Sequence, residues 1–146
     1  EGIAVAEILA GQSGHVNYDT IPSVVYTDPE VAWVGLTEKE AKDKSIPYEL
    51  GDFPWSASGK AMILNAVQGK TKILFDPETK KVLGGAVVGP VAGDLISEIS
   101  LALEMGSDVE DIALTVHPHP TLGETVGAAA EVLEGTMTDL FIPQKR

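Results

Sequence analysis

The chain has 146 residues, of which 44% are hydrophobic and 22% charged, a size and balance typical of about one globular domain rather than a disordered chain. Its formal net charge of −12 argues against nucleic-acid binding, which requires clustered Lys and Arg, and no apolar run approaches the roughly 18 residues that cross a bilayer. It contains no cysteine, which excludes disulfides, thiolate metal sites and a cysteine nucleophile within it and fits a cytosolic protein.

The chain begins with a segment that favours a helix but has no residue to cap it. Residues 1–10 lack Ser, Thr, Asp and Asn. A helix that starts without a cap predicts a chain cut from a longer polypeptide. Residues 11–19 follow as a loop rich in Gly and polar residues, in which His15 is expected to be merely solvated.

The middle of the chain predicts strands, because β-branched and aromatic residues gather between turn signals. We expect strands at residues 21–27, 31–36, 48–55, 70–75 and 82–88. The last two should form a hairpin around residues 76–80. The pair Gly84-Gly85 weakens its second arm and indicates a bulge or a close backbone approach.

Helices are expected after two capping boxes and along two apolar stripes. The boxes are Thr37 to Glu40 and Ser107 to Glu110. The expected helices cover residues 37–44, 91–105, 107–114 and 121–133, with a short helical or irregular run near 60–67. Strands grouped before the final helices predict an α+β fold with a mainly antiparallel sheet and helices packed on it. No G-x-G-x-x-G segment indicates a dinucleotide site.

Several side chains outside the main motif have structural interpretations. Leu95, Ile99 and Leu103 should belong to the core, and Trp33 and Trp55 to the core or an interface. The small residues 127–130 should allow close helix packing, against another subunit in one interpretation. Residues 141–146 are expected to form a tail.

The stretch His117-Pro-His-Pro-Thr-Leu-Gly-Glu124 concentrates the possible acid–base chemistry of the chain. Glu124 has two interpretations. It is three residues after Thr121, the spacing of a capping box. Alternatively, it faces back to accept a hydrogen bond from His119, because a carboxylate partner fixes the tautomer of an imidazole and makes it a better general base.

The two histidines of this stretch leave further alternatives open. A His-x-His pair can bind metal when both rings project to one side, but Pro118 and Pro120 favour a polyproline-like path that splays them. A purely structural pair is the other interpretation, and His117 has no obvious partner in the sequence. A cis bond between His119 and Pro120 would form a tight turn that aims the His119 ring.

The stretch also resembles the H-x-H-P-T-x-x-E motif of the class I pyridine nucleotide–disulfide oxidoreductases. The resemblance runs from about residue 18 onward, through residues 21–30, 34–38, 53–61 and 83–86. It is greatest to the C-terminal dimerisation (interface) domain of the dihydrolipoamide dehydrogenases. Pro118 stands where Ala is common in the family, and Gly123 where Ser is common.

The resemblance implies a role that this chain performs as part of a larger enzyme. Such enzymes oxidise protein-bound dihydrolipoamide with NAD, through FAD and a disulfide. His119 would be the acid–base residue and Glu124 the group that holds it, both supplied to the partner subunit's active site. Residues 1–17 would end the preceding FAD-binding region, and residues 18–146 would form the dimerisation domain.

The same resemblance implies the partners and cofactors of the protein. It implies a homodimer in the bacterial cytoplasm that meets the lipoyl domain of a 2-oxo acid dehydrogenase complex. FAD and NAD would be bound mainly by regions absent here, with no metal.

Three alternatives remain at this point. The chain could belong to another flavoprotein disulfide reductase, or be a dimerisation module without chemistry. It could also be a metallohydrolase that uses His117, His119 and Glu124.

Overall fold

The computed structural model describes residues 2–14 and 20–140, and the main element in them is a five-stranded sheet. The strands are β1 (Ser23–Val25), β2 (Val31–Gly35), β3 (Glu49–Pro54), β4 (Lys70–Phe75) and β5 (Val82–Val88). Their order across the sheet is β1-β2-β5-β4-β3, and every neighbouring pair is antiparallel. The predicted α+β class with an antiparallel sheet is therefore confirmed.

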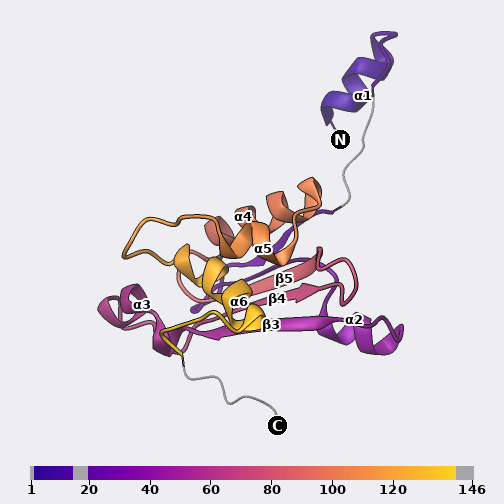
Figure 1. Ribbon diagram of the computed structural model, residues 1–146. Helices are drawn as coiled ribbons and strands as arrows, with labels where there is room; N and C mark the ends of the chain where they lie inside the picture. Colours follow the sequence, from indigo (N-terminus) through magenta and orange to yellow (C-terminus); the bar gives the residue numbers. More distant parts are fainter. Residues whose placement is uncertain (1, 15–19, 141–146) are drawn as a thin grey trace.

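Three of the described helices, all from the second half of the chain, lie over the sheet. The helices are α1 (Gly2–Leu9), α2 (Glu38–Asp43), α3 (Gly59–Ile63), α4 (Ala92–Met105), α5 (Val109–Ala113) and α6 (Glu124–Glu134), with a 3₁₀ turn at Trp55–Ala57. Helix α4 packs on β2 and β5, whereas α6 packs on β3, β4 and α5. Figure 1 shows α4, α5 and α6 together over the sheet, with α1 apart from them.

The core lies between the sheet and these helices. In strand β4, Thr71, Ile73, Leu74 and Phe75 are buried, whereas Lys70 is exposed and Lys72 is half-buried. Ile99 is fully buried on α4, and Leu95 and Leu103 pack against the same core, as expected. Burial of these apolar side chains is the main force that holds the helices on the sheet.

The β4–β5 hairpin forms where the sequence predicts it. The side chain of Asp76 accepts hydrogen bonds from the backbone N–H groups of Glu78 and Thr79, at 2.9 and 2.7 Å. An Asp at the start of a turn commonly bonds to its own backbone in this way. The turn thereby sets the register in which β4 meets β5.

Two glycines permit close approach between backbones. A Cβ on Gly51 of β3 would lie 2.1 Å from the carbonyl oxygen of Ala129 in α6. One on Gly84 of β5 would lie 2.3 Å from the carbonyl oxygen of Leu36. The expected close approach at Gly84 is confirmed, and α6 lies directly on β3 because residue 51 has no side chain.

The small residues of α6 do not serve the other-subunit packing proposed as one interpretation. Gly127, Ala128, Ala129 and Ala130 are all buried within this chain. Helix α6 packs on β3, β4 and α5, so small side chains are needed for the helix to approach its own sheet. That part of the sequence interpretation is wrong.

Two helix starts differ from the prediction. The second capping box is formed by Asp108 and Asp111 rather than by Ser107 and Glu110. Helix α6 begins at Glu124 rather than at residue 121. At α5, Ser107 and Asp108 both have a carboxylate at capping spacing, and only the backbone path selects between them. At α6 the N-cap residue is Gly123, and no side chain caps the helix. The Thr37–Glu40 box is confirmed in full.

Three expectations concern residues outside the described part of the chain. These are the solvation of His15, the domain boundary between residues 17 and 18, and the tail at 141–146. Among the residues that the structure does describe, no helix is both long and apolar enough to cross a membrane.

Candidate active site

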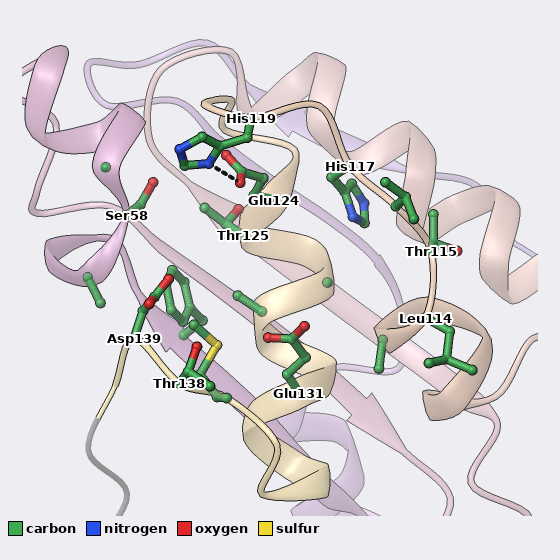
Figure 2. Close-up of a pocket in the computed structure, with 18 residues that line it drawn as sticks. Ser58, Leu114, Thr115, His117, His119, Glu124, Thr125, Glu131, Thr138 and Asp139 are labelled. Carbon is green, nitrogen blue, oxygen red and sulfur yellow. Dashed lines mark hydrogen bonds and ion pairs between the residues drawn. The ribbon is translucent and has the colours of Figure 1, made fainter.

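The motif lies on a loop that connects α5 to α6. Residues 115–123 form this loop, and Glu124 is the first residue of α6. The peptide bond between His119 and Pro120 is cis, as the hypothesis required. Figure 2 shows the loop at the end of α6, with the His119 and Glu124 side chains next to each other.

His119 and Glu124 form a hydrogen-bonded pair at the surface. Nδ1 of His119 lies 2.7 Å from Oε1 of Glu124, and the His119 side chain is 80% exposed. The second carboxylate oxygen, Oε2, accepts a hydrogen bond from the backbone N–H of Thr121 at 2.6 Å. The carboxylate therefore holds both the ring and the loop that carries it.

The capping-box interpretation of Glu124 is half realised. Glu124 does accept from the Thr121 backbone, but the Thr121 hydroxyl donates to the carbonyl of Pro118 at 2.7 Å instead of capping the helix. The N-cap position is Gly123, which has no side chain to cap with. The carboxylate thus serves the loop and the imidazole together rather than completing a cap.

The surroundings of Glu124 favour its ionised form. Partial burial opposes ionisation, but the hydrogen bonds from the Thr121 backbone and from His119 outweigh it, so the pKa of Glu124 lies below its ordinary value. A carboxylate that stays ionised accepts the Nδ1–H of His119 and leaves the lone pair on Nε2. That nitrogen belongs to an exposed ring, so it can take a proton from a group brought by another molecule.

His117, to which the sequence analysis assigned no partner, does have one. Its Nε2 lies 2.6 Å from Oε1 of Glu98 on α4, and its side chain is only 11% exposed. The two motif histidines therefore engage different carboxylates. In the described residues, no group of three or more His, Asp or Glu side chains comes together to hold a metal, so His117, His119 and Glu124 do not converge as the metallohydrolase interpretation requires.

A groove of about 460 Å³ begins at the His119–Glu124 pair and follows α6. Its polar lining besides that pair includes Ser58, Thr115, Glu131, Thr138 and Asp139. Apolar residues such as Phe53 and Met137 also line it. The site is a concave surface with an exposed base at one end, open to a partner molecule (Figure 2).

A buried chain of hydroxyl groups lies beneath the site and was missed by the sequence analysis. Trp55 Nε1 donates to the Thr71 hydroxyl at 2.9 Å, and the hydroxyls of Thr71 and Thr125 are 2.8 Å apart. The Thr125 hydroxyl donates to the carbonyl of Leu122 at 2.7 Å. The available signal was a polar residue, Thr71, at a buried position of strand β4, between two lysines.

Comparison with known proteins identifies the class to which this fold and site belong. Residues 21–130 match the family described as pyridine nucleotide-disulphide oxidoreductase, dimerisation domain, and the chain belongs to that family. The resemblance drawn from the sequence is thereby confirmed at the level of the domain.

The relatives within this family are dihydrolipoyl dehydrogenases. The chain is 57% identical to the dihydrolipoyl dehydrogenase of Vibrio cholerae over 96% of its length, which is 30% of that protein. It is 50% identical to the mitochondrial dihydrolipoyl dehydrogenase of Schizosaccharomyces pombe over 88% of its length and 25% of that protein. The chain therefore spans less than a third of the length of these curated relatives.

Solved structures agree on the fold. LpdA from Mycobacterium tuberculosis superposes with a TM-score of 0.79 at 26% identity, over 87% of this chain and 28% of that one. A flavoprotein disulfide reductase from Escherichia coli, RclA in a Cu(II) complex, superposes with a TM-score of 0.81 at 19% identity, over 90% of this chain and 30% of that one. The second likeness shows the fold alone.

Proposed function

We propose that this chain is the dimerisation domain of a dihydrolipoamide dehydrogenase, and that His119, held by Glu124, is the acid–base residue of the partner subunit's active site. In this proposal residues 18–146 form the domain, and residues 1–17 end the preceding FAD-binding region. The observation that carries it is an imidazole that is 80% exposed yet bound by an ionised carboxylate at 2.7 Å. The names of the relatives support the choice of enzyme.

The proposed proton transfer needs only the atoms described above. Nε2 of His119 takes the proton from a thiol of protein-bound dihydrolipoamide, which leaves a thiolate on the substrate. The thiolate, unlike the thiol, is the nucleophile that attacks a disulfide. The imidazolium formed is stabilised by the negative charge of Glu124, as in other His–carboxylate pairs.

The redox groups belong elsewhere in the proposed enzyme. In this proposal FAD and NAD would supply the transfer of the electron pair and would be bound mainly by other regions of the enzyme. The adjacent glycines Gly84 and Gly85 lie close against the backbone of Leu36 and the side chain of Ile99, which leaves no room for a phosphate at that pair. The residues of the His119–Glu124 pair fit proton transfer.

The proposed partners follow from the same enzyme. The protein would be a homodimer in the bacterial cytoplasm, and its substrate would be carried by the lipoyl domain of a 2-oxo acid dehydrogenase complex. The chain has no cysteine, so the disulfide of the reaction must come from another part of the enzyme. In the proposed dimer, one subunit would supply the exposed His119 and the other would supply the disulfide of the same active site.

Hybrid dimers of the full-length enzyme test this proposal. One subunit carries His119→Gln and the other lacks the redox cysteines. If His119 acts across the interface, one of the two sites combines intact cysteines with an intact His119, and the hybrid retains about half of the wild-type turnover. If His119 acts within its own subunit, both sites are defective and the hybrid is inactive.

The homodimeric variants complete the test. His119→Gln should lower turnover with dihydrolipoamide by about two to four orders of magnitude, the usual contribution of a general base, with FAD still bound. Glu124→Gln should lower it less, because the amide still accepts a hydrogen bond from the ring. Near-normal turnover of His119→Gln would contradict the base role and leave a dimerisation module without chemistry.

A further inference from the structure

His117 lies two residues before His119 but in the opposite environment. Its side chain is 11% exposed, against 80% for His119. Figure 2 shows the two rings pointing in different directions from the same loop. The ring lines the groove, but it is nearly buried and its Nε2 is 2.6 Å from a carboxylate of α4, so we look for its role in the contacts that it makes within the domain.

The His117 ring fills a slot between α4 and α6. A Cβ on Gly127 would lie 3.1 Å from both Cε1 and Nδ1 of the ring, and one on Gly123 would lie 3.8 Å from Cδ2. The ring therefore rests on the bare backbone of α6, while Nε2 bonds to Glu98 of α4. One side chain connects the loop to the two longest helices that cover the sheet.

The centre of the loop, residues 118–120, has few other attachments in the described part of the chain. Pro118 and Pro120 have no N–H to donate. Two hydrogen bonds join residues 118–120 to other residues: the His119 ring donates to the Glu124 carboxylate, and the Pro118 carbonyl accepts from the Thr121 hydroxyl. Both partners follow residues 118–120 in the chain. On the preceding side the loop is held by Thr115, which bonds to the backbone of α5, and by the bond between His117 and Glu98.

We propose that His117 and Glu98 are positioning residues, which hold the loop so that Nε2 of His119 meets the proton that it transfers. This inference rests on the function proposed above. Proton transfer requires the two heavy atoms to approach within about 2.6–3.2 Å, and a displacement of about 1 Å can cost about a hundredfold in rate. Without the Glu98 bond, the loop keeps His119 and Glu124 but loses its attachment to α4.

The test uses the full-length, FAD-loaded dimer. Glu98→Leu and His117→Leu should lower kcat with dihydrolipoamide about ten- to a hundredfold, with KM little changed. Glu98→Gln and His117→Gln should restore most of the activity, because each keeps a hydrogen-bonding group near the original atom. Glu110→Leu is the matched control, since it removes an exposed carboxylate from the neighbouring helix α5, and it should leave kcat unchanged.

Two further measurements separate positioning from damage to the fold. Reduction of a dye by NADH requires the flavin but no thiol deprotonation, so all the variants should retain it. In a His119→Gln background, Glu98→Leu should cause no additional loss of kcat, because it acts through His119.

Normal kcat in Glu98→Leu would overturn the positioning inference. An equal loss of kcat in the His119→Gln background, or a parallel loss of dye reduction, would overturn it as well. Each of these results leaves the base role of His119 intact. Normal kcat in His119→Gln would instead overturn the proposed function itself.

Discussion

Replacement of the buried threonines by valine should expose how the loop is attached to the sheet. Trp55 Nε1 donates to Thr71, Thr71 is 2.8 Å from Thr125, and Thr125 donates to the Leu122 carbonyl. A threonine hydroxyl has one hydrogen, and that of Thr125 goes to Leu122, so Thr71 must donate to Thr125. Both hydroxyl-bearing side chains are 0% exposed, so water cannot replace a missing partner.

The magnitude follows from the groups left without partners. Thr125→Val preserves shape, but it removes the hydrogen bond to the Leu122 carbonyl and leaves the Thr71 hydroxyl with no acceptor. At about 1 kcal/mol for the lost hydrogen bond to Leu122 and about 1–3 kcal/mol for the unsatisfied Thr71 hydroxyl, the free energy of unfolding should fall by about 2–4 kcal/mol. Thr71→Val should cost a similar amount, because it leaves the Trp55 indole N–H unpaired.

The double variant makes the prediction specific. With Thr71 and Thr125 both valine, the unpaired Thr71 hydroxyl no longer exists, so the combined loss should be less than the sum by about 1–2 kcal/mol. Urea unfolding followed by tryptophan fluorescence measures each free energy. Thr115→Val is the control, because its hydroxyl bonds at an exposed site. Additive losses, or single losses as small as that of the control, would refute the reasoning.

Two other predictions concern packing and charge. Gly51→Ala should destabilise the fold by about 3 kcal/mol, because its Cβ would lie 2.1 Å from the Ala129 oxygen. Gly59→Ala is the control, since a Cβ there has nothing within 4 Å, and it should change the midpoint of urea unfolding little. Equal midpoints for the two variants would contradict the close approach at Gly51. The hydrogen bond from Lys72 lowers the pKa of Glu38 below 4.5. The stability from this pair is therefore present above pH 4.5 and lost as pH falls through the lower folded value. Lys72→Met should show a smaller loss of stability between pH 7 and about 3.5, and an unchanged loss would contradict the pairing.

Local patterns predicted most of the fold because they act over short separations. The hairpin turn at Asp76 and the Thr37–Glu40 box are formed by residues within one turn of each other, and both occur as predicted. The pairing of His119 with Glu124, five residues apart, is also present. Where two overlapping sequences could cap the same helix, as at Ser107 and Asp108, residue pattern alone did not decide between them.

The amino-acid sequence alone was enough to indicate the class of fold, the motif and the His119–Glu124 pair, since each depends on residues adjacent in the chain. The tertiary structure decided what lies beneath and beside them. Glu98 meets His117 across 19 residues, and Thr71 meets Thr125 across 54. Such contacts exist only once α4 and α6 are packed on the sheet. The burial of apolar surface drives this packing, and it does not depend on which polar side chains the helices carry, so the sequence pattern does not predict the polar pairs.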